Sequence, residues 1–339
     1  MGSQAIVIIG GGPAGLACAL SLRSHGFDGR LTLVDGSDVH VLQPRLQEFL
    51  RPGAAPVRAP FAEIAERIGF DFVRGQVALD AARLASLDDE RVLQVGERRL
   101  SFDYLVVATG SAPVRPAPPG GLDLTHLRRC ERGRSERPRW IIGGGATAVQ
   151  LATDLAFEES VRLVTADDRL VPELPMAFHA AAMARLHELE CEVALRTWVD
   201  DAPWGSWWLT GLAPSPALRC NEFGQVRVRR FVLDRVYAVG DAARFDGDGM
   251  NMLSAQAAVA KGKHVADGIR RRLAGRFQLP YASQSKGYVL SLGPDDAIAW
   301  VGRPDRIVRG TAALTLHEVL SVQYAAMLRG IDLYLQTGF

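Results

Sequence analysis

Short continuous apolar runs alternate along the chain with segments in which apolar residues recur every three or four positions. The continuous runs predict strands buried in a sheet, and the periodic segments predict amphipathic helices. This alternation is typical of an α/β fold with a parallel sheet. We expect strands at residues 5–9, 31–34, 75–80, 105–111, 140–142, 161–164, 192–198, 235–239, 288–292 and 298–301, a hairpin within residues 83–102, and helices at residues 13–24, 149–157, 178–190, 253–273 and 314–335.

The first apolar run leads directly into Gly10, Gly12 and Gly15, in the sequence GGGPAG. In a strand–turn–helix unit, the first glycine makes the turn, the second lets a pyrophosphate approach the backbone, and the third lets the helix pack close to the strand. Pro13 and Ala14 open the helix, whose N-terminus adds positive potential at the phosphates. The motif predicts a dinucleotide site, although a glycine turn that binds nothing would have the same sequence.

Asp35 ends the second predicted strand, 20 residues past Gly15. A dinucleotide-binding fold needs a carboxylate at this place to accept hydrogen bonds from the adenosine ribose. The alternative is an aspartate that only caps a turn. A later apolar strand ends in Ala108, Thr109 and Gly110, small residues that let the chain turn away sharply beside a bound cofactor.

The opening pattern recurs after a Pro- and Gly-rich stretch at residues 112–121, which we interpret as a linker. An apolar strand leads into Gly143, Gly145 and Ala148 and then into a helical segment. Two such units in one chain predict two nucleotide-binding domains.

Gly240 and Asp241 end another apolar strand near the start of the long helix at residues 253–273. An aspartate there can bond a ribityl hydroxyl, while backbone N–H groups face a phosphate. The alternative is again a turn aspartate without a ligand.

Composition and charge exclude several classes of function. A chain of 339 residues is long for one core, so two or three domains are expected. The net charge of +1 gives no basic field for nucleic acid. The four cysteines are far apart, so we expect neither a thiol–disulfide relay nor a metal site. The first strand begins by residue 5 and no apolar run reaches about 20 residues, so we expect a cytoplasmic protein.

In this order, the four glycine-containing signals resemble the flavoproteins with two dinucleotide-binding domains, the pyridine nucleotide–disulfide oxidoreductase superfamily. The resemblance implies an FAD-dependent oxidoreductase with NAD(P)H as a second nucleotide. It also implies an α/β fold with two Rossmann-like domains. Residues 1–112 and 213–275 would form the FAD domain, residues 113–212 a shortened NAD(P)-type domain inserted into it, and residues 276–339 a small C-terminal α+β segment.

Three stretches resemble type II NADH dehydrogenases and apoptosis-inducing-factor-like proteins: residues 40–48, 255–258 and 286–293. The cysteine pair of the disulfide reductases is missing after Asp35, and Ala260 stands where the dehydrogenase motif usually has glutamine. By this resemblance, the glycines of the first turn and Asp35 hold the ADP half of FAD. Val77 lies on the strand beside the adenine, Asp241 binds the ribityl chain or pyrophosphate, and Gln256 and Lys286 lie close to the isoalloxazine.

The second nucleotide unit departs from the family. Strand register places Thr165 where the ribose carboxylate belongs, and an alternative register places Asp168 there. Gln150 stands where the family commonly has a glutamate near the nicotinamide. Little sequence separates Trp198 from Trp207, where relatives have a strand meander.

These departures leave three functions open. The first is electron transfer from NAD(P)H through FAD to a quinone or similar small acceptor. The second is oxidation of a small organic substrate in a biosynthetic pathway without NAD(P)H, with His40, Arg45 or Glu48 as base or anchor. The third is a flavin-bearing binding or signalling protein without turnover. The apolar C-terminal helix would cover the domain, pair two subunits in a homodimer, or lie on the inner face of a membrane.

Overall fold

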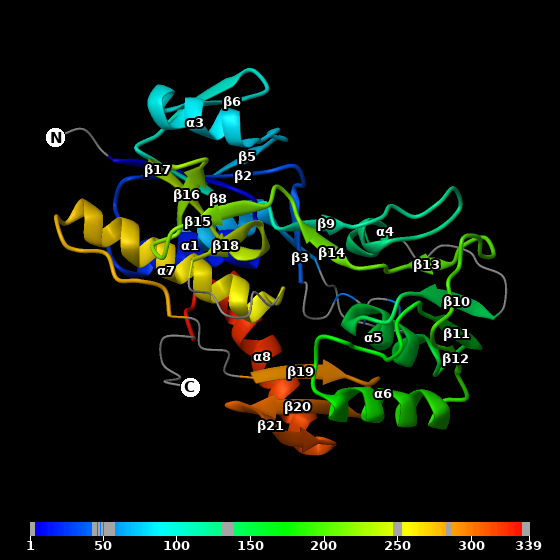
Figure 1. Ribbon diagram of the computed structural model, residues 1–339. Coiled ribbons are helices and arrows are strands. Elements are labelled where there is room, and N and C mark those ends of the chain that lie inside the picture. The colour runs from blue at the N-terminus through cyan, green and yellow to red at the C-terminus, as the bar shows by residue number, and fades with distance from the viewer. Residues whose placement is uncertain are drawn as a thin grey trace.

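The computed structural model describes residues 4–42, 46, 48, 50, 58–129, 138–246, 253–282 and 287–333. The described elements form a large mixed sheet, a smaller parallel sheet and a C-terminal antiparallel sheet, each with its own helices (Figure 1). The predicted α/β class with Rossmann-like sheets is therefore confirmed. The domain boundaries given above stay a prediction.

The large sheet has the strand order β18-β15-β16-β17-β8-β1-β2-β5. Its parallel strands β5, β2, β1, β8 and β17 follow the order of a dinucleotide-binding fold. They are nearly continuous apolar runs because the sheet is covered on its faces. Their bounds are β1 (Ala5–Ile9), β2 (Arg30–Asp35), β5 (Asp71–Arg74), β8 (Tyr104–Val107) and β17 (Phe231–Ala238), with β15 (Leu218–Cys220), β16 (Gln225–Val228) and β18 (Ala243–Phe245) at one edge.

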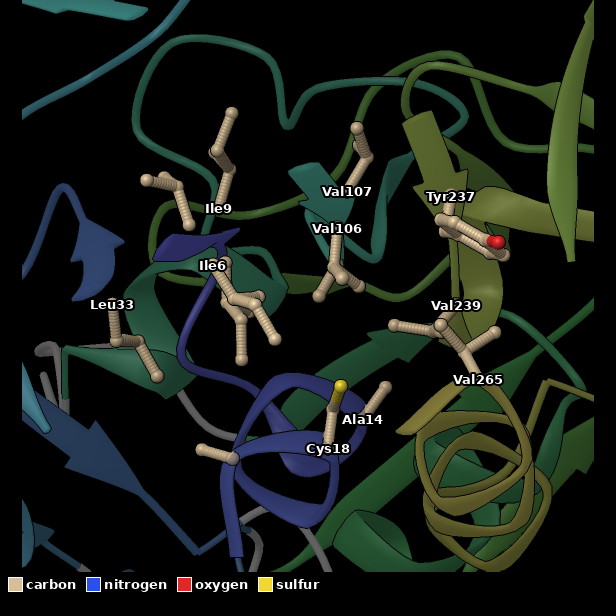
Figure 2. Close-up of a cluster of buried hydrophobic side chains, with 14 of the residues drawn as sticks. Ile6, Ile9, Ala14, Cys18, Leu33, Val106, Val107, Tyr237, Val239 and Val265 are labelled. Atoms are coloured by element: carbon tan, nitrogen blue, oxygen red, sulfur yellow. The ribbon is translucent and has the colours of Figure 1, made fainter. Parts of the chain in front are cut away.

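Helices α1 (Pro13–Ser24) and α7 (Ala255–Leu273) pack side by side beneath this sheet. Figure 2 shows Ala14 and Cys18 of α1 directed toward the sheet, with Val265 of α7 beside them. The helices approach closely at Gly262, where an added Cβ would lie 2.2 Å from the carbonyl oxygen of Ala14. The first glycine turn is thus fixed to a packed core.

The smaller sheet is parallel and has the order β12-β11-β10-β13. Helix α5 packs on it and also contacts α6 and β19. The sheet lies away from the larger one in Figure 1. The bounds are β10 (Arg139–Ile142), β11 (Val161–Val164), β12 (Glu192–Ala194), β13 (Trp207–Trp208), α4 (Leu124–Arg128), α5 (Ala146–Leu155) and α6 (Met176–Glu188).

The chain leaves the large sheet through β9 (Ser111–Pro113) and returns through β14 (Leu212–Pro214), and these strands pair antiparallel. The pairing is extended by two backbone hydrogen bonds, each from the residue after one strand to the glycine before the other. The N–H of Ser215 donates to the carbonyl of Gly110 at 3.0 Å, and the N–H of Val114 donates to that of Gly211 at 3.1 Å. Since β9 follows β8 and β14 follows β13, this antiparallel pair connects the large sheet to the smaller one.

The C-terminal part consists of an antiparallel sheet and α8 (Thr311–Leu328), which packs on that sheet and also contacts α1 and α2. It lies below the large sheet in Figure 1. The strands are β19 (Gly287–Ser291), β20 (Ala297–Val301) and β21 (Arg303–Arg309), and the remaining elements are β3 (Val39–Val41), β4 (Arg58–Pro60), α2 (Phe61–Ile68), α3 (Ala81–Glu90), β6 (Val92–Val95), β7 (Arg98–Ser101) and the short 3₁₀ helix η2 (Gly240–Ala242).

Several predicted elements were wrong in kind or extent. Residues 75–80 form no strand, because Asp80 caps α3 by accepting the N–H of Arg83 at 2.7 Å. Residues 83–86 therefore belong to this helix, and only β6 and β7 form the hairpin. The strand at residues 192–198 ends at Ala194, and α8 ends at Leu328 rather than residue 335. The sequence analysis also missed β21.

Candidate functional site

The carboxyl ends of the central parallel strands open onto a cavity of about 600 Å³. In open α/β sheets ligands bind at this edge, where the strand order reverses. Residues from β1, β2 and β9, and from the segments after β5, β8 and β14, line the cavity. Among them are the predicted site residues Gly10, Asp35, Val77 and Thr109, together with Ser111 and Pro216.

The glycines of the first turn meet separate steric demands. Gly10 has φ +108°, and an added Cβ would lie 2.3 Å from the carbonyl oxygen of Ala108. An added Cβ at Gly15 would lie 2.0 Å from the carbonyl oxygen of Gly10. Gly12 has no atom within 4 Å of such a Cβ, so the space above it is open on the ligand side. Gly12 also precedes α1 without a side-chain cap, which leaves backbone N–H groups for a phosphate.

Asp35 lies at the end of β2 and is fixed by the backbone on both sides. Its Oδ2 accepts the N–H of Gly11 at 2.7 Å, and its Oδ1 accepts the N–H of Ser37 at 2.8 Å. Each carboxylate oxygen has further lone pairs, so these bonds orient the group without using its full acceptor capacity. The site therefore presents an oriented carboxylate at the ribose position.

Asp241 lies in η2, after the end of β17, and faces Ser111 across the sheet edge. Its Oδ2 accepts the hydroxyl of Ser111 at 2.8 Å. Burial raises the pKa of Asp241, and the Ser111 hydroxyl, Lys261 and Arg128 oppose that rise. The carboxylate is thus half-buried among donors, where a polyol hydroxyl can also reach it.

Arg128, at the end of α4, is the residue that the sequence analysis missed. Its Nη1 donates to the carbonyl oxygen of Ser111 at 3.4 Å, and its buried Nε has no hydrogen-bond partner among the described residues. Burial lowers the pKa of Arg128, and the charges of Asp241, Asp123 and Asp35 oppose the change. The sequence signal that could have predicted α4, and with it Arg128, is the capping box in which Asp123 and His126 bond each other's backbone.

The second glycine turn repeats the backbone of the first. The N–H of Gly10 donates to Val34, and the N–H of Gly143 donates to Val164, both at 2.8 Å. Gly143 has φ +132°, and its added Cβ would lie 2.2 Å from the carbonyl oxygen of Leu209. The residue that follows Val164 is Thr165, so Thr165 holds the register position of Asp35.

The side chains around Thr165 are tied to one another. Its Oγ1 donates to the Oδ2 of Asp167 at 3.1 Å and accepts the N–H of Asp167 at 3.2 Å. Asp168 is exposed and lies three positions beyond this register position, so its role as the ribose carboxylate stays a prediction. Ala148 is buried in α5, and Gln150, one turn into the same helix, is half-buried.

The remaining predicted residues are dispersed. His40 is buried, with Nδ1 on the carbonyl of Gly11 at 2.9 Å and Nε2 on the hydroxyl of Tyr324 at 3.0 Å. Burial lowers the pKa of His40 to about 4. Both ring nitrogens are occupied, so His40 is a packing link and the prediction that it acts as a base is not supported. Glu48 is also buried.

Four further residues were predicted to lie in the site: Gln256 and Lys286 near the flavin, Val77 near the adenine, and Arg45 as a base or anchor. Gln256 is half-buried in the first turn of α7. Val77 lines the cavity from a segment without regular structure, not from a strand. Arg45 and Lys286 lie outside the described residues.

Over the ranges that the structure describes, α7 and α8 are the longest helices, and neither they nor any shorter one combine the length and apolar character needed to cross a bilayer.

A family model described as pyridine nucleotide-disulphide oxidoreductase matches residues 4–203. The chain belongs to this family. Membership confirms the predicted class, an FAD-dependent oxidoreductase, and the predicted cofactor FAD, and it supports NAD(P)H, which the sequence analysis left open, as the electron donor. The electron acceptor is the partner that the family leaves unspecified.

Individual relatives support different acceptors. A ferredoxin–NAD(+) reductase component of the p-cumate 2,3-dioxygenase system of Pseudomonas putida is 35% identical over 202 residues, which cover 54% of this chain and 48% of that protein. This chain thus spans about half the length of that relative. Demethylphylloquinone reductase NdbB of Synechocystis is 27% identical, with 86% of this chain and 85% of that protein covered.

Among solved structures, NDH2 from Plasmodium falciparum in complex with NADH superposes with a TM-score of 0.76. The superposition covers 100% of this chain and 99% of that one, at 12% sequence identity. This likeness shows that the two chains share a fold over their whole length.

Proposed function

We propose that the protein transfers electrons from NAD(P)H through bound FAD to a quinone or a similar small acceptor. The observation that carries this proposal is the pair of glycine turns with the same backbone geometry, each after a central parallel strand. Each of the two turns can hold one dinucleotide. When bound, FAD supplies the redox chemistry by accepting a hydride from the reduced nicotinamide and passing electrons on.

The residues of the first turn fit FAD. The open space at Gly12 lets phosphate oxygens reach the uncapped N–H groups of α1, whose dipole favours the negative charge. Asp35, oriented by the N–H of Gly11, would accept hydrogen bonds from the ribose hydroxyls, and Asp241, beside Ser111, would accept one from a ribityl hydroxyl. Arg128 places a guanidinium with an unused N–H near these groups, where it neutralises pyrophosphate charge.

Quinone is favoured over ferredoxin by the extent of the matches. The quinone reductase NdbB matches over most of both chains, whereas the ferredoxin reductase component matches over about half of each. A small acceptor also needs no protein-docking surface. Gln256, at the start of α7, is the residue that we place beside the acceptor and the flavin.

The experiment that tests this function is anaerobic mixing of the purified flavoprotein with NADH or NADPH while flavin absorbance is recorded. Bleaching within seconds at sub-millimolar nucleotide supports the proposal. Adding a water-soluble quinone should then restore the oxidised spectrum, and reduced ferredoxin should not form in a parallel reaction. No bleaching with either nucleotide would exclude the proposal and leave the NAD(P)H-independent oxidase or the binding protein.

We also propose that α8 gives the protein a peripheral contact with a membrane, where quinones are dissolved. Its outer face exposes Val319 and Val322, at 48% and 59% of their full area. Flotation with liposomes should carry the wild-type chain and leave a Val319→Glu, Val322→Glu variant in solution. Sedimentation of both forms without lipid would show instead whether this face joins two subunits.

A further inference from the structure

Thr165, at the register position of Asp35, has no carboxylate, but Asp167 places one just beyond the end of β11. In the first turn, one oxygen of Asp35 accepts the N–H two residues ahead, from Ser37. In the second turn, Oγ1 of Thr165 accepts the N–H two residues ahead, from Asp167. The threonine hydroxyl therefore replaces one carboxylate oxygen in the same local bond.

The carboxylate of Asp167 takes the place of the second oxygen that Asp35 has in the first turn. The hydroxyl of Thr165 donates its proton to Oδ2 of Asp167 at 3.1 Å, which draws the Asp167 side chain back over the strand end. Thr165 is buried, whereas Asp167 is exposed. Asp167 thus has one oxygen held by a buried hydroxyl and open acceptor capacity toward solvent.

We propose that Asp167 is the acceptor for the adenosine ribose hydroxyls of the second nucleotide, and that it makes this site select NADH over NADPH. This inference rests on the proposed function. An oriented carboxylate accepts bonds from the 2′- and 3′-hydroxyls and repels a 2′-phosphate. A neutral threonine alone would do neither.

Three arginines, Arg169, Arg115 and Arg196, are the cations that could favour NADPH over NADH. The guanidinium of Arg169 donates to the carbonyl of Pro172, and that of Arg115 lies over the Trp198 ring, 4.8 Å from its centroid. Arg196 is exposed, and its N–H donates to the carbonyl of Asp167 at 2.9 Å. If Arg115 or Arg196 dominated the site, a 2′-phosphate would be favoured instead.

Direct binding distinguishes these outcomes without turnover. Titration calorimetry of the flavin-loaded protein with ADP-ribose and with 2′-phospho-ADP-ribose should show at least ~10-fold tighter binding of ADP-ribose, because hydrogen bonds to a charged group are the strong ones. Asp167→Asn should weaken ADP-ribose binding about 10-fold and narrow the preference. Asp168→Asn, the matched exposed neighbour, should change neither value.

The readouts separate this inference from the function on which it rests. Flavin bleaching by NADH, with equal ligand binding in Asp167→Asn and Asp168→Asn, would overturn the role of Asp167 and leave the function standing. Tighter binding of 2′-phospho-ADP-ribose by the wild type would overturn it too. If neither nucleotide bleaches the flavin and neither ADP-ribose compound binds, the function itself fails.

Discussion

The first and second glycine turns share their backbone and differ in the side chains around it. In each, a glycine with positive φ donates to the carbonyl of a valine near the end of the neighbouring strand, and its missing Cβ leaves room for a backbone carbonyl that follows a third strand. At the next position one turn has Asp35 and the other has Thr165. Phosphate recognition depends on backbone N–H groups, so it survives such a change, while ribose recognition depends on one side chain.

The turns are also fastened differently. The carbonyl of Gly11 accepts the ring of His40, which in turn reaches Tyr324 of α8. The corresponding carbonyl of Gly144 accepts the backbone N–H of Val171. The first turn is therefore connected to a distant part of the chain, and the second is closed within its own sheet. This difference means that the two turns should respond separately to substitution.

The largest effects should come from the glycines with positive φ. Gly10→Ala places a Cβ against a carbonyl oxygen at 2.3 Å and should destabilise the protein by about 4 kcal/mol, with loss of flavin. Gly143→Ala has the same clash at 2.2 Å, but in the smaller sheet. We expect it to keep the flavin and lose the response to NADH, which absorbance and thermal unfolding would show.

The open glycines provide the matched controls. Gly12→Ala and Gly145→Ala meet no atom within 4 Å, so both variants should fold with nearly wild-type stability. Gly12→Ala should still weaken FAD binding, because its Cβ occupies the space for phosphate, and Gly145→Ala should weaken only nucleotide binding. Equal behaviour of all four variants would contradict the assignment of one dinucleotide to each turn.

A smaller effect is expected at Arg128, which lies at the end of α4 and donates to the carbonyl oxygen of Ser111. Arg128→Met should raise the FAD dissociation constant about 10-fold, because a charged donor to the pyrophosphate is lost. The apo-protein should be as stable or slightly more stable, since a buried guanidinium without a full set of partners is removed. Arg129→Met, at the exposed neighbour, is the control, and equal FAD affinities would exclude Arg128 from the site.

The effect of His40 is smallest at neutral pH and grows only as the pH falls. The pKa of His40 is about 4 in the folded state and about 6.5 when unfolded, so the unfolded chain binds more protons between these values. The free energy of unfolding should therefore fall by up to about 3 kcal/mol as pH drops from 7 toward 4. The raised pKa of Asp241 acts in the opposite direction and remains in both forms. Denaturation curves of wild type and His40→Gln should diverge in slope over this range, whereas parallel pH profiles would contradict this account.

The parts of the site that could be predicted from sequence are local. Gly10, Gly12 and Gly15 follow an apolar run within a few residues. An added Cβ at Gly10 or Gly15 would meet a backbone oxygen at 2.3 or 2.0 Å, whereas Gly12 leaves open space for a ligand. Asp35 and Thr165 follow from counting along one strand. The failed predictions were local as well: residues 75–80 were taken for a strand because the cap at Asp80 was overlooked.

The sequence by itself determined the fold class, the presence of two nucleotide turns and the residue types at the strand ends, because those signals are written in contiguous segments. Only the tertiary structure decided which distant groups meet there. Arg128 reaches Ser111 through the crossing of β9 and β14, and His40 meets Tyr324 from 284 positions away. Such contacts depend on how the chain folds back on itself, and spacing along the sequence carries no record of them.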